Sequence, residues 1–423
     1  MSGKTELLIF DDQPGQVVVE SAIFQDIHPQ TAIDSSTSVI DFVIQGSTTE
    51  YLDLNDTLLS LKVKVTHGDG SLLTPKDTVQ PIPSNYFLNA LFSDVQLLLN
   101  DVQIEGGSTL YPYKATIETA LNFNDDAKRI QLLPSGVSEN DAERAKWCKD
   151  SQEFEIVGAL RLDFLNQPKY LIPGVSVQLR LTRAKDVFAL HLADGTPDNG
   201  TYTFKVGITQ CLLYVRRVKV NPSVEKGHII GLKKGNAIYP YTRSKTISYS
   251  ISTGSTSFFK ENLFSTGLLP KFIVIALVHG DAFNGSYGQK CFKFEHFKLS
   301  QLSLFRDGQS VPYKRSYNMH WGKKHFTDAY VRSILQNTQM LNTNNNNGID
   351  MKDFSENGYT FFTFNLAPDF DMNQVQIPRD ANLRLDMRFS DALKHSINVI
   401  AYAIYDAKVQ ITGDRHIITD AHT

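Results

Sequence analysis

The feature that most constrains this chain is a likeness between its two halves. The stretch VQLRLTR begins at Val177 and the stretch LRLDMRF begins at Leu383, and both alternate aliphatic residues with polar or basic ones. Matching Leu179 to Leu383 separates the two stretches by 204 positions, nearly half of the 423 residues. Because alternation is common in β-strands, the test of a duplication is whether other features share this offset.

Four further features recur in the same order in both halves. They are a strand that runs into a polar turn, a stretch with helical spacing of apolar residues, an Ile-Pro dipeptide and a long terminal strand. In the first half these features begin at Val95, Tyr113, Ile172 and Tyr202. In the second half they begin at Leu302, Phe326, Ile377 and Ser396. A common order at similar offsets indicates a tandem duplication. It predicts three superposed pairs, namely Leu179 with Leu383, Ile172 with Ile377, and Leu97 with Leu304.

Each half contains the strand patterns of a β-sandwich. The expected strands are 38–44, 58–65, 95–100, 154–162, 175–182 and 202–220 in the first half, and 237–252, 272–279, 302–305, 359–366, 382–389 and 397–412 in the second. Turns rich in Gly, Pro and Asn separate them, and no long helices alternate with them, which argues against a doubly wound parallel sheet. The prediction is an all-β fold of two tandem eight-stranded antiparallel jelly rolls, with short helices in the loops.

The repeat also predicts how the chain divides. Its length exceeds what one hydrophobic core usually supports. Residues 36–220 are expected to form the first jelly roll and residues 221–412 the second. Pro222, in a Gly-rich connector near 220–235, cannot donate to a strand ladder and so ends the preceding strand. Residues 1–35 and 413–423 lack sustained periodicity and are expected to be an N-terminal arm and a C-terminal tail.

Composition and charge exclude several functions. The formal net charge of −3 supplies no strong positive field, which argues against sequence-specific nucleic-acid binding. The basic cluster of Arg216, Arg217 and Lys219 is interpreted as a solvated strand face. The three cysteines are far apart, so no disulfide framework is expected. The N-terminus does not read as a secretory signal, and the longest apolar run, 272–278, is too short to span a bilayer.

Chemistry-bearing side chains are scattered along the sequence. His320 and His325 lie five positions apart, which is the wrong phase for a shared metal face on a helix, and Cys291 has only His296 nearby. We interpret all four as structural or surface residues. The sequence contains no nucleophile elbow, P-loop, dinucleotide-binding glycine pattern or HExxH motif. We therefore predict no catalytic, cofactor-binding or metal site, no cofactor and no enzymatic activity.

Two acidic groups are the alternative to this prediction. Asp350, Asp353 and Glu356 do not have the spacing of a calcium-binding loop. Asp369 and Asp371 are interpreted as part of a polar turn. The alternative is that these two, joined by Asp350 or Glu356, hold a structural cation between subunits, because oxygen-rich loops suit calcium.

Several long runs carry a resemblance to a known family. They include EYLDLNDTLLSLKVKVTHGDGS (Glu50–Ser71) and NYFLNALFSDVQLLLNDVQIEGGSTLYPYKATIETALNFNDDAKRIQL (Asn85–Leu132). Others are YLIPGVSVQLRLTRAKDVFAL, LLYVRRVKVNPSV, NAIYPYTR, HGDAFNGSYGQKCFKFEHF and HSINVIAYAIY. From about residue 36 to about residue 412, the chain resembles the hexon-type major capsid proteins of adintoviruses and Polinton (Maverick) elements.

The resemblance implies a double jelly roll with the architecture of adenovirus hexon. Three subunits would form a homotrimeric, pseudo-hexagonal capsomer, because six barrels then surround the threefold axis. The implied partners are neighbouring capsomers and penton or minor capsid proteins. The implied location is the virion, after synthesis in the cytoplasm or nucleus of the host cell.

Two alternatives remain beside this reading. One is a carbohydrate-binding or enzymatic duplicated β-sandwich, for which a cupin-like member would need a His/Glu metal set in at least one half. The other is a minor capsid protein, for which a single jelly roll of half this length is expected.

Overall fold

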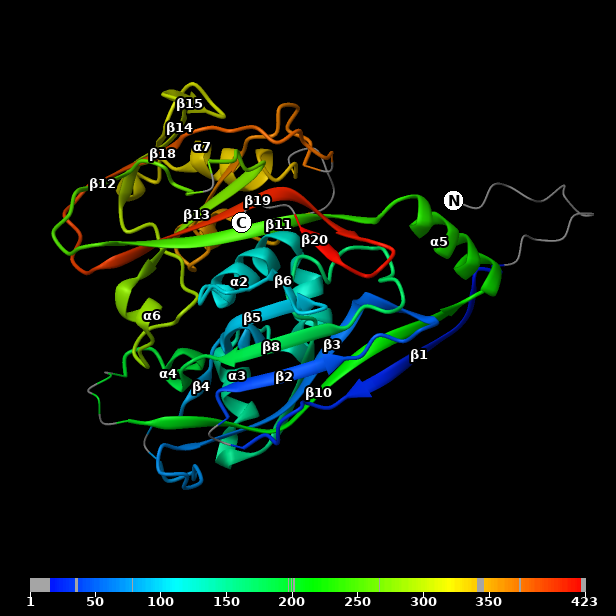
Figure 1. Ribbon diagram of the computed structural model, residues 1–423. Helices are drawn as coiled ribbons and strands as arrows, with labels where there is room; N and C mark the ends of the chain where they lie inside the picture. The colour runs from blue at the N-terminus through cyan, green and yellow to red at the C-terminus, as the bar shows by residue number, and fades with distance from the viewer. Residues whose placement is uncertain are drawn as a thin grey trace, which may run out of the picture.

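Strands, and the order in which they pair, define the architecture of this chain. The computed structural model describes residues 16–34, 37–77, 79–196, 198, 200, 202–265, 267–340, 346–372 and 374–419. Figure 1 shows two β-units stacked on each other, the first coloured blue to green and the second green to red. Helix α5 (Pro222–Lys234) connects them at one end.

The strands follow each other along the chain in two sets. The first set is β1 (Val19–Ile27), β2 (Val39–Ile44), β3 (Glu50–His67), β4 (Ile82–Pro83), β5 (Phe92–Leu99), β6 (Val102–Glu105), β7 (Phe154–Gly158), β8 (Val177–Arg183), β9 (Leu190–His191) and β10 (Phe204–Val220). The second set is β11 (Ala237–Ile251), β12 (Ser257–Lys260), β13 (Phe272–His279), β14 (Leu299–Arg306), β15 (Gln309–Val311), β16 (Tyr317–Asn318), β17 (Phe361–Asn365), β18 (Leu383–Phe389), β19 (Ile397–Ile411) and β20 (Ile417–Thr419).

The helices are short and lie between strands. The α-helices besides α5 are α1 (Phe87–Ala90), α2 (Tyr111–Asn122), α3 (Asp141–Trp147), α4 (Asp186–Ala189), α6 (Gly280–Asn284), α7 (Thr327–Tyr330) and α8 (Met351–Ser355). Other helical turns are η1 (Ala127–Gln131), η2 (Leu133–Ser135), η3 (Lys149–Ser151), η4 (Trp321–Lys323) and η5 (Val331–Gln336). The helical stretches that the sequence predicts in each half correspond to α2 and to α7 with η5.

The two units have the same sheet topology. In the first unit one sheet has the order β1-β10-β3-β7 and the other β2-β8-β5-β6. In the second the orders are β11-β19-β13-β17, with β20 beside β19, and β12-β18-β14-β15, with β16 beside β14. The strand pairs are antiparallel. The fold is a double jelly roll, which confirms the predicted fold class.

A shared irregularity shows that the two rolls follow one plan. The register between β5 and β8 shifts at Ser93, and the register between β14 and β18 shifts at Ser300. Each serine Oγ donates to a main-chain carbonyl of the opposite strand, Ser93 to Arg183 at 3.2 Å and Ser300 to Arg388 at 2.9 Å. A β-bulge is a local feature that must be specified by its own residues. Its recurrence 207 positions apart, with the same residue type, is strong support for a duplication.

The ladders refine the predicted superposition. The offset of 207 between the two bulge serines makes Leu97 and Leu304 equivalent, as predicted. Leu97 pairs with Leu179, and Leu304 pairs with Leu385. The equivalent of Leu179 is therefore Leu385, two residues beyond the predicted Leu383. A pattern of period two cannot distinguish registers that differ by two residues, since both put the same face on the core.

Alternate residues of these strands form the core of each roll. On β8 and β18 the buried side chains alternate with partly exposed ones along most of each strand, and the buried set is Val177, Leu179, Leu181, Leu383, Leu385, Met387 and Phe389. Burial of a side chain of this size contributes roughly 1.5–3 kcal/mol. The buried residues of the alternating pattern that predicts the strands therefore also hold the two sheets of each roll together.

Three segments differ from the loops that the sequence predicts. The expected N-terminal arm contains β1, which pairs with β10, and the expected tail contains β20, which pairs with β19. Residues 1–15 of the arm and 420–423 of the tail lie outside the described residues. The expected connector is helix α5, where Asn221 caps the N-terminus and Pro222 occupies the first turn. The division of the chain at residues 36, 221 and 413 stays a prediction.

Candidate assembly surfaces

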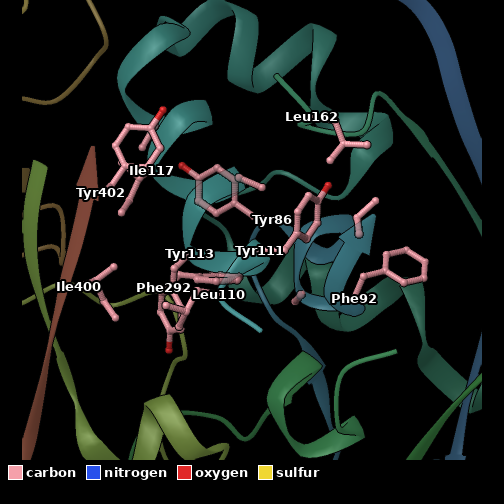
Figure 2. Close-up of a cluster of buried hydrophobic side chains, with 14 of the residues drawn as sticks. Tyr86, Phe92, Leu110, Tyr111, Tyr113, Ile117, Leu162, Phe292, Ile400 and Tyr402 are labelled. Atoms are coloured by element: carbon pink, nitrogen blue, oxygen red, sulfur yellow. The ribbon is translucent and has the colours of Figure 1, made fainter. Parts of the chain in front are cut away.

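The junction between the two rolls contains an aromatic cluster around helix α2. The ring of Tyr113 stacks on Phe283 of the second roll at 5.5 Å between centroids and meets Phe292 edge-on at 5.8 Å. Figure 2 shows Tyr113 and Phe292 together within this cluster. Each such aromatic pair contributes about 0.5–1.5 kcal/mol beyond its buried area. The junction is therefore packed in the manner of a protein core.

A buried lysine and three carboxylates lie in the same junction. The Nζ atom of Lys114 lies 2.8 Å from Glu105, 3.0 Å from Asp163 and 3.5 Å from Glu118, and it donates to the carbonyl of Arg161 at 2.7 Å. Side chains of this kind are almost never buried unless they are paired. One ammonium faces three carboxylates, so the cluster carries excess negative charge unless two of the carboxylates are protonated.

The second roll completes the hydrogen bonds of this cluster. Ser244 of β11 donates to Asp163 Oδ2 from its main-chain N–H at 2.6 Å and from its Oγ at 2.7 Å. Tyr402 of β19 donates to Glu118 at 2.9 Å. The acids of the first roll therefore have donors in the second, and separating the rolls would remove these hydrogen bonds and leave only the contacts with Lys114.

Glu118 is an acid of this cluster whose surroundings favour its protonated form. Burial is the largest influence and raises the pKa of Glu118 to about 8, while Lys114 opposes that rise and Asp163 adds to it. Burial also raises the pKa of Glu105, but this carboxylate accepts from the main-chain N–H groups of Asp163 and Phe164 at 3.0 and 3.2 Å, which favours its charged form.

Residues 163–172 of the first roll, here called the first docking segment, lie along the edge of β11 that faces away from β19. Besides the Asp163–Ser244 bonds, Lys169 Nζ donates to the carbonyl of Ile238 at 2.8 Å. The Tyr239 hydroxyl donates to the carbonyl of Tyr170 at 3.1 Å. An edge strand presents unpaired main-chain groups, and proteins commonly cover such edges with a loop. The first docking segment provides that cover inside the chain.

An aromatic anchor holds this segment against β11. Phe164 is 0% exposed, and its ring lies 5.3 Å from the ring of Tyr241 and 6.0 Å from that of Tyr239. Ile172, at the other end of the segment, donates from its main-chain N–H to the Tyr239 hydroxyl at 3.1 Å. The two ends of the segment therefore contact the same edge strand.

Strand β1 is the corresponding edge of the first roll, and it is open. It is the terminal strand of its sheet, paired to β10 on one side, and no described strand pairs with its other side. Its residues are exposed or half-buried throughout, including Ile23 and Phe24. A long uncovered edge with apolar side chains is a site at which another chain segment can add.

The acidic residues that the sequence singled out have local structural partners. Asp350 caps helix α8 and forms a capping box with Asp353. Asp369 accepts from the main-chain N–H of Asp371 at 3.0 Å, within an exposed turn. Glu356 ends the same helix α8. Among the residues that the structure describes, no three His, Cys, Asp or Glu side chains are grouped so that they could hold a metal ion.

The histidine and cysteine candidates make local contacts within the fold. His320 and His325 form a main-chain bridge, with ring centroids 6.5 Å apart. His296 stacks on Trp321 at 3.9 Å between centroids, and burial lowers the pKa of its imidazole to about 4. Cys291 is buried and free, as are the other two cysteines.

The basic cluster at the end of β10 is paired with acids. Arg216 donates to Asp53 at 3.1 Å and to Asp56 at 2.6 Å. Lys219 lies 3.0 Å from Glu20. The sequence predicted a solvated strand face for this cluster, and the structure adds ion pairs that join neighbouring strands across that face.

The cavity of about 860 Å³ between the rolls carries both signs of charge. Its lining includes Arg144, His191, Lys290 and Asp141, and Lys290 Nζ lies 2.9 Å from Asp141. Acidic and basic side chains from both rolls neutralise each other there. The cavity therefore does not select a ligand of one charge.

Comparison with known proteins places the fold among viral capsid structures. No family model matches the chain. Uncharacterized protein F54H12.2 of Caenorhabditis elegans is 25% identical over 398 residues, which cover 90% of this chain and 93% of the worm protein.

No helix among the described residues is long and apolar enough to cross a membrane.

Two solved structures match nearly the whole chain. PBCV-1 VP54, as fitted into a reconstruction of the virophage Sputnik, has a TM-score of 0.58 and 11% identity and covers 97% of this chain and 98% of its own. The mavirus major capsid protein has a TM-score of 0.55 and 12% identity and covers 98% of this chain and 93% of its own. At this identity the likeness establishes the double jelly-roll fold.

Sequence reasoning missed both the lysine cluster and the docking segment. Lys114 lies in a stretch whose spacing predicts a helix, and nothing local in the sequence distinguishes it from a solvated residue. The docking segment did have a signal. The dipeptide Asp163-Phe164 recurs as Asp369-Phe370, 206 positions later, which is the offset that the ladder gives for Leu179 and Leu385.

Proposed function

We propose that this chain is a major capsid protein that assembles as a homotrimeric, pseudo-hexagonal capsomer of an icosahedral virion. The observation that carries the proposal is the match of both jelly rolls, over 97% and 98% of the chain, to two capsid structures. A partial or single-roll match would have supported only a general β-sandwich. On this proposal the chain acts through shape and repeated contacts and is not an enzyme.

The finer assignment is to the capsids of adintoviruses and Polinton (Maverick) elements. Its support is the run of motifs from Glu50 onward. On this proposal the partners are neighbouring capsomers and penton or minor capsid proteins, and the protein resides in the virion. The chain reads no nucleic-acid sequence, binds no cofactor and holds no metal.

Mass measurement and electron microscopy test the proposal. Purified protein at micromolar concentration should give a species of about 142 kDa, three times the 47.5 kDa of the chain. Negative-stain images should show threefold particles or shells. A species of 47.5 kDa alone, with no particles at any concentration tested, would contradict it.

A further inference from the structure

The first docking segment has a counterpart in the second roll. The ladder offset of 206 matches residues 163–172 to residues 369–378, of which 369–372 and 374–378 are described and are here called the second docking segment. Both segments begin with Asp-Phe, at Asp163 and Asp369, and both precede the strand that pairs with the bulged strand, β8 in one roll and β18 in the other. They therefore occupy the same place in the two rolls.

The two segments differ in what covers them. Phe164 is 0% exposed, whereas its equivalent Phe370 is 43% exposed. Ile172 is 8% exposed, whereas Ile377, which the sequence matches with it, is 79% exposed. Phe164 and Ile172 are buried where β11 of the next roll lies against the first segment. Among the described residues, no strand of another roll lies against the second segment.

The ladders align β1 with β11. Leu59 of β3 pairs with Gly158, and Phe272 of β13 pairs with Asn365. Gly158 and Asn365 are 207 positions apart, the same offset as between the bulge serines, so Leu59 and Phe272 are equivalent.

Following the ladders outward then gives the edge residues. From Leu59 the strand pairing continues across β10 to Ile27 of β1. From Phe272 it continues across β19 to Ser244 of β11, so Ile27 and Ser244 are equivalent. Three residues earlier on each strand, Phe24 occupies the position that Tyr241 has on β11. Phe24 is 62% exposed, and Tyr241 is the ring on which Phe164 packs.

We propose that the second docking segment of one copy covers the open edge of β1 in a second copy of this chain. In that contact Phe370 packs on Phe24 as Phe164 packs on Tyr241, and Asp369 accepts from the main-chain N–H of Ile27 as Asp163 accepts from Ser244. This inference rests on the proposed capsomer and names the surfaces that close it. Each roll then covers the edge strand of the next roll with its docking segment, both within one chain and between two chains.

The contact is heterologous, because different surfaces of the two copies meet. Each copy offers one segment and one edge, so copies join head to tail, and the set is complete only when the ring closes. An exposed edge strand and an exposed phenylalanine are both liabilities in an isolated subunit. A closed ring removes both, which is why the second copy is the occupant that fits.

Cross-linking tests which residues meet. The double variant Phe24→Cys/Phe370→Cys is treated with a short bismaleimide and run on a denaturing gel. The three native cysteines are buried, and burial raises the pKa of each thiol to about 12, so the reagent should spare them. We expect covalent dimers and trimers from the double variant and none from either single variant. The matched control is Phe24→Cys/Phe259→Cys, since Phe259 is exposed but lies on β12, outside the proposed contact.

Charged substitutions test what the contact contributes. Phe370→Asp and Phe24→Asp should each raise the concentration at which half of the trimer dissociates by at least about tenfold, as expected for a central aromatic contact. Phe259→Asp should leave it within about twofold. Circular dichroism of each variant checks that the monomer keeps its β-structure.

The outcomes separate this inference from the proposed function. A wild-type trimer whose double-cysteine variant does not cross-link, or which tolerates Phe370→Asp, overturns the inference and leaves the capsomer standing. The same result is expected if residues 1–15 of the chain itself cover β1. An equal effect of Phe259→Asp would also overturn it, because the loss would not be specific to the segment. Protein that is monomeric at every concentration overturns both.

Discussion

The two docking segments begin with the same dipeptide, hold the same place in their rolls and end in different environments. In the first, Phe164 is enclosed by tyrosines of β11; in the second, Phe370 is partly in solvent. The shared Asp-Phe dipeptide therefore does not by itself decide whether its phenylalanine is core or surface. What differs is the neighbour, because β11 of the second roll lies against the first segment and no described strand lies against the second.

The charged residues at the internal junction are a second difference between the two rolls. At the offset of 213 that relates the two helical stretches, Thr327 and Val331 stand where Lys114 and Glu118 stand in the first roll. The second roll therefore repeats the aromatic anchor of the junction without its buried ion cluster. The junction inside the chain is permanent, so it tolerates a network that would be costly to open.

The largest expected effect is at Lys114. Lys114→Met should lower the free energy of unfolding by about 5 kcal/mol, because three buried carboxylates lose their cation. Thr327→Met, the same replacement at the aligned position of the second roll, should change it by no more than about 0.5 kcal/mol. Urea denaturation measures both. Equal effects at the two positions would show that the ion cluster does not distinguish the junctions.

The two phenylalanines give the next largest contrast. Phe164→Ala should cost about 4 kcal/mol at any protein concentration, because it leaves a cavity in a buried junction. Phe370→Ala should cost less than about 0.5 kcal/mol in dilute protein, where subunits are separate, and more as concentration rises. Thermal melts across a dilution series measure this. A concentration-independent loss for Phe370→Ala would place it in the fold of the single chain.

A pH dependence should come from Glu118. Its pKa is raised from 4.5 to about 8, so the folded state binds the extra proton in that interval. Its contribution to stability is present in full below pH 4.5 and is lost as pH rises through about 8. Relative to the wild type, Glu118→Gln should gain about 2–3 kcal/mol between pH 5 and pH 8.5.

The control for this experiment is Glu261→Gln, at an exposed position of the second roll. It should follow the wild type at both pH values. A Glu118→Gln variant that also follows the wild type would mean that the cluster does not hold its proton at this residue.

The smallest expected effect is at the bulges, where the rolls should behave alike. Ser93→Ala and Ser300→Ala each remove a hydroxyl that bonds to the opposite strand, and each should cost about 1 kcal/mol. Urea denaturation with an unchanged slope measures the loss. A large difference between the two variants would show that only one bulge depends on its serine.

The sequence by itself determined the repeat and the class of fold. Alternation marked β8 and β18, and Pro222 marked the end of β10, because these are local consequences of side-chain direction and of a missing N–H. It also determined that His320, Cys291 and Asp350 have no partners at catalytic or metal-ligand spacing along the chain. The register of the repeat was predicted only to within two residues, since period two leaves that choice open.

Tertiary structure decided which surfaces are covered. β1 was not predicted because both of its faces are largely exposed, so its residues show no alternation, and only its pairing with β10 identifies it as a strand. Helix α5 was not predicted because its glycines resemble those of a loop, while Asn221 and Pro222 start it. Lys114 meets Glu105 and Asp163 only after distant segments fold together. Long-range contacts of this kind depend on the position of whole sheets, which no local pattern encodes.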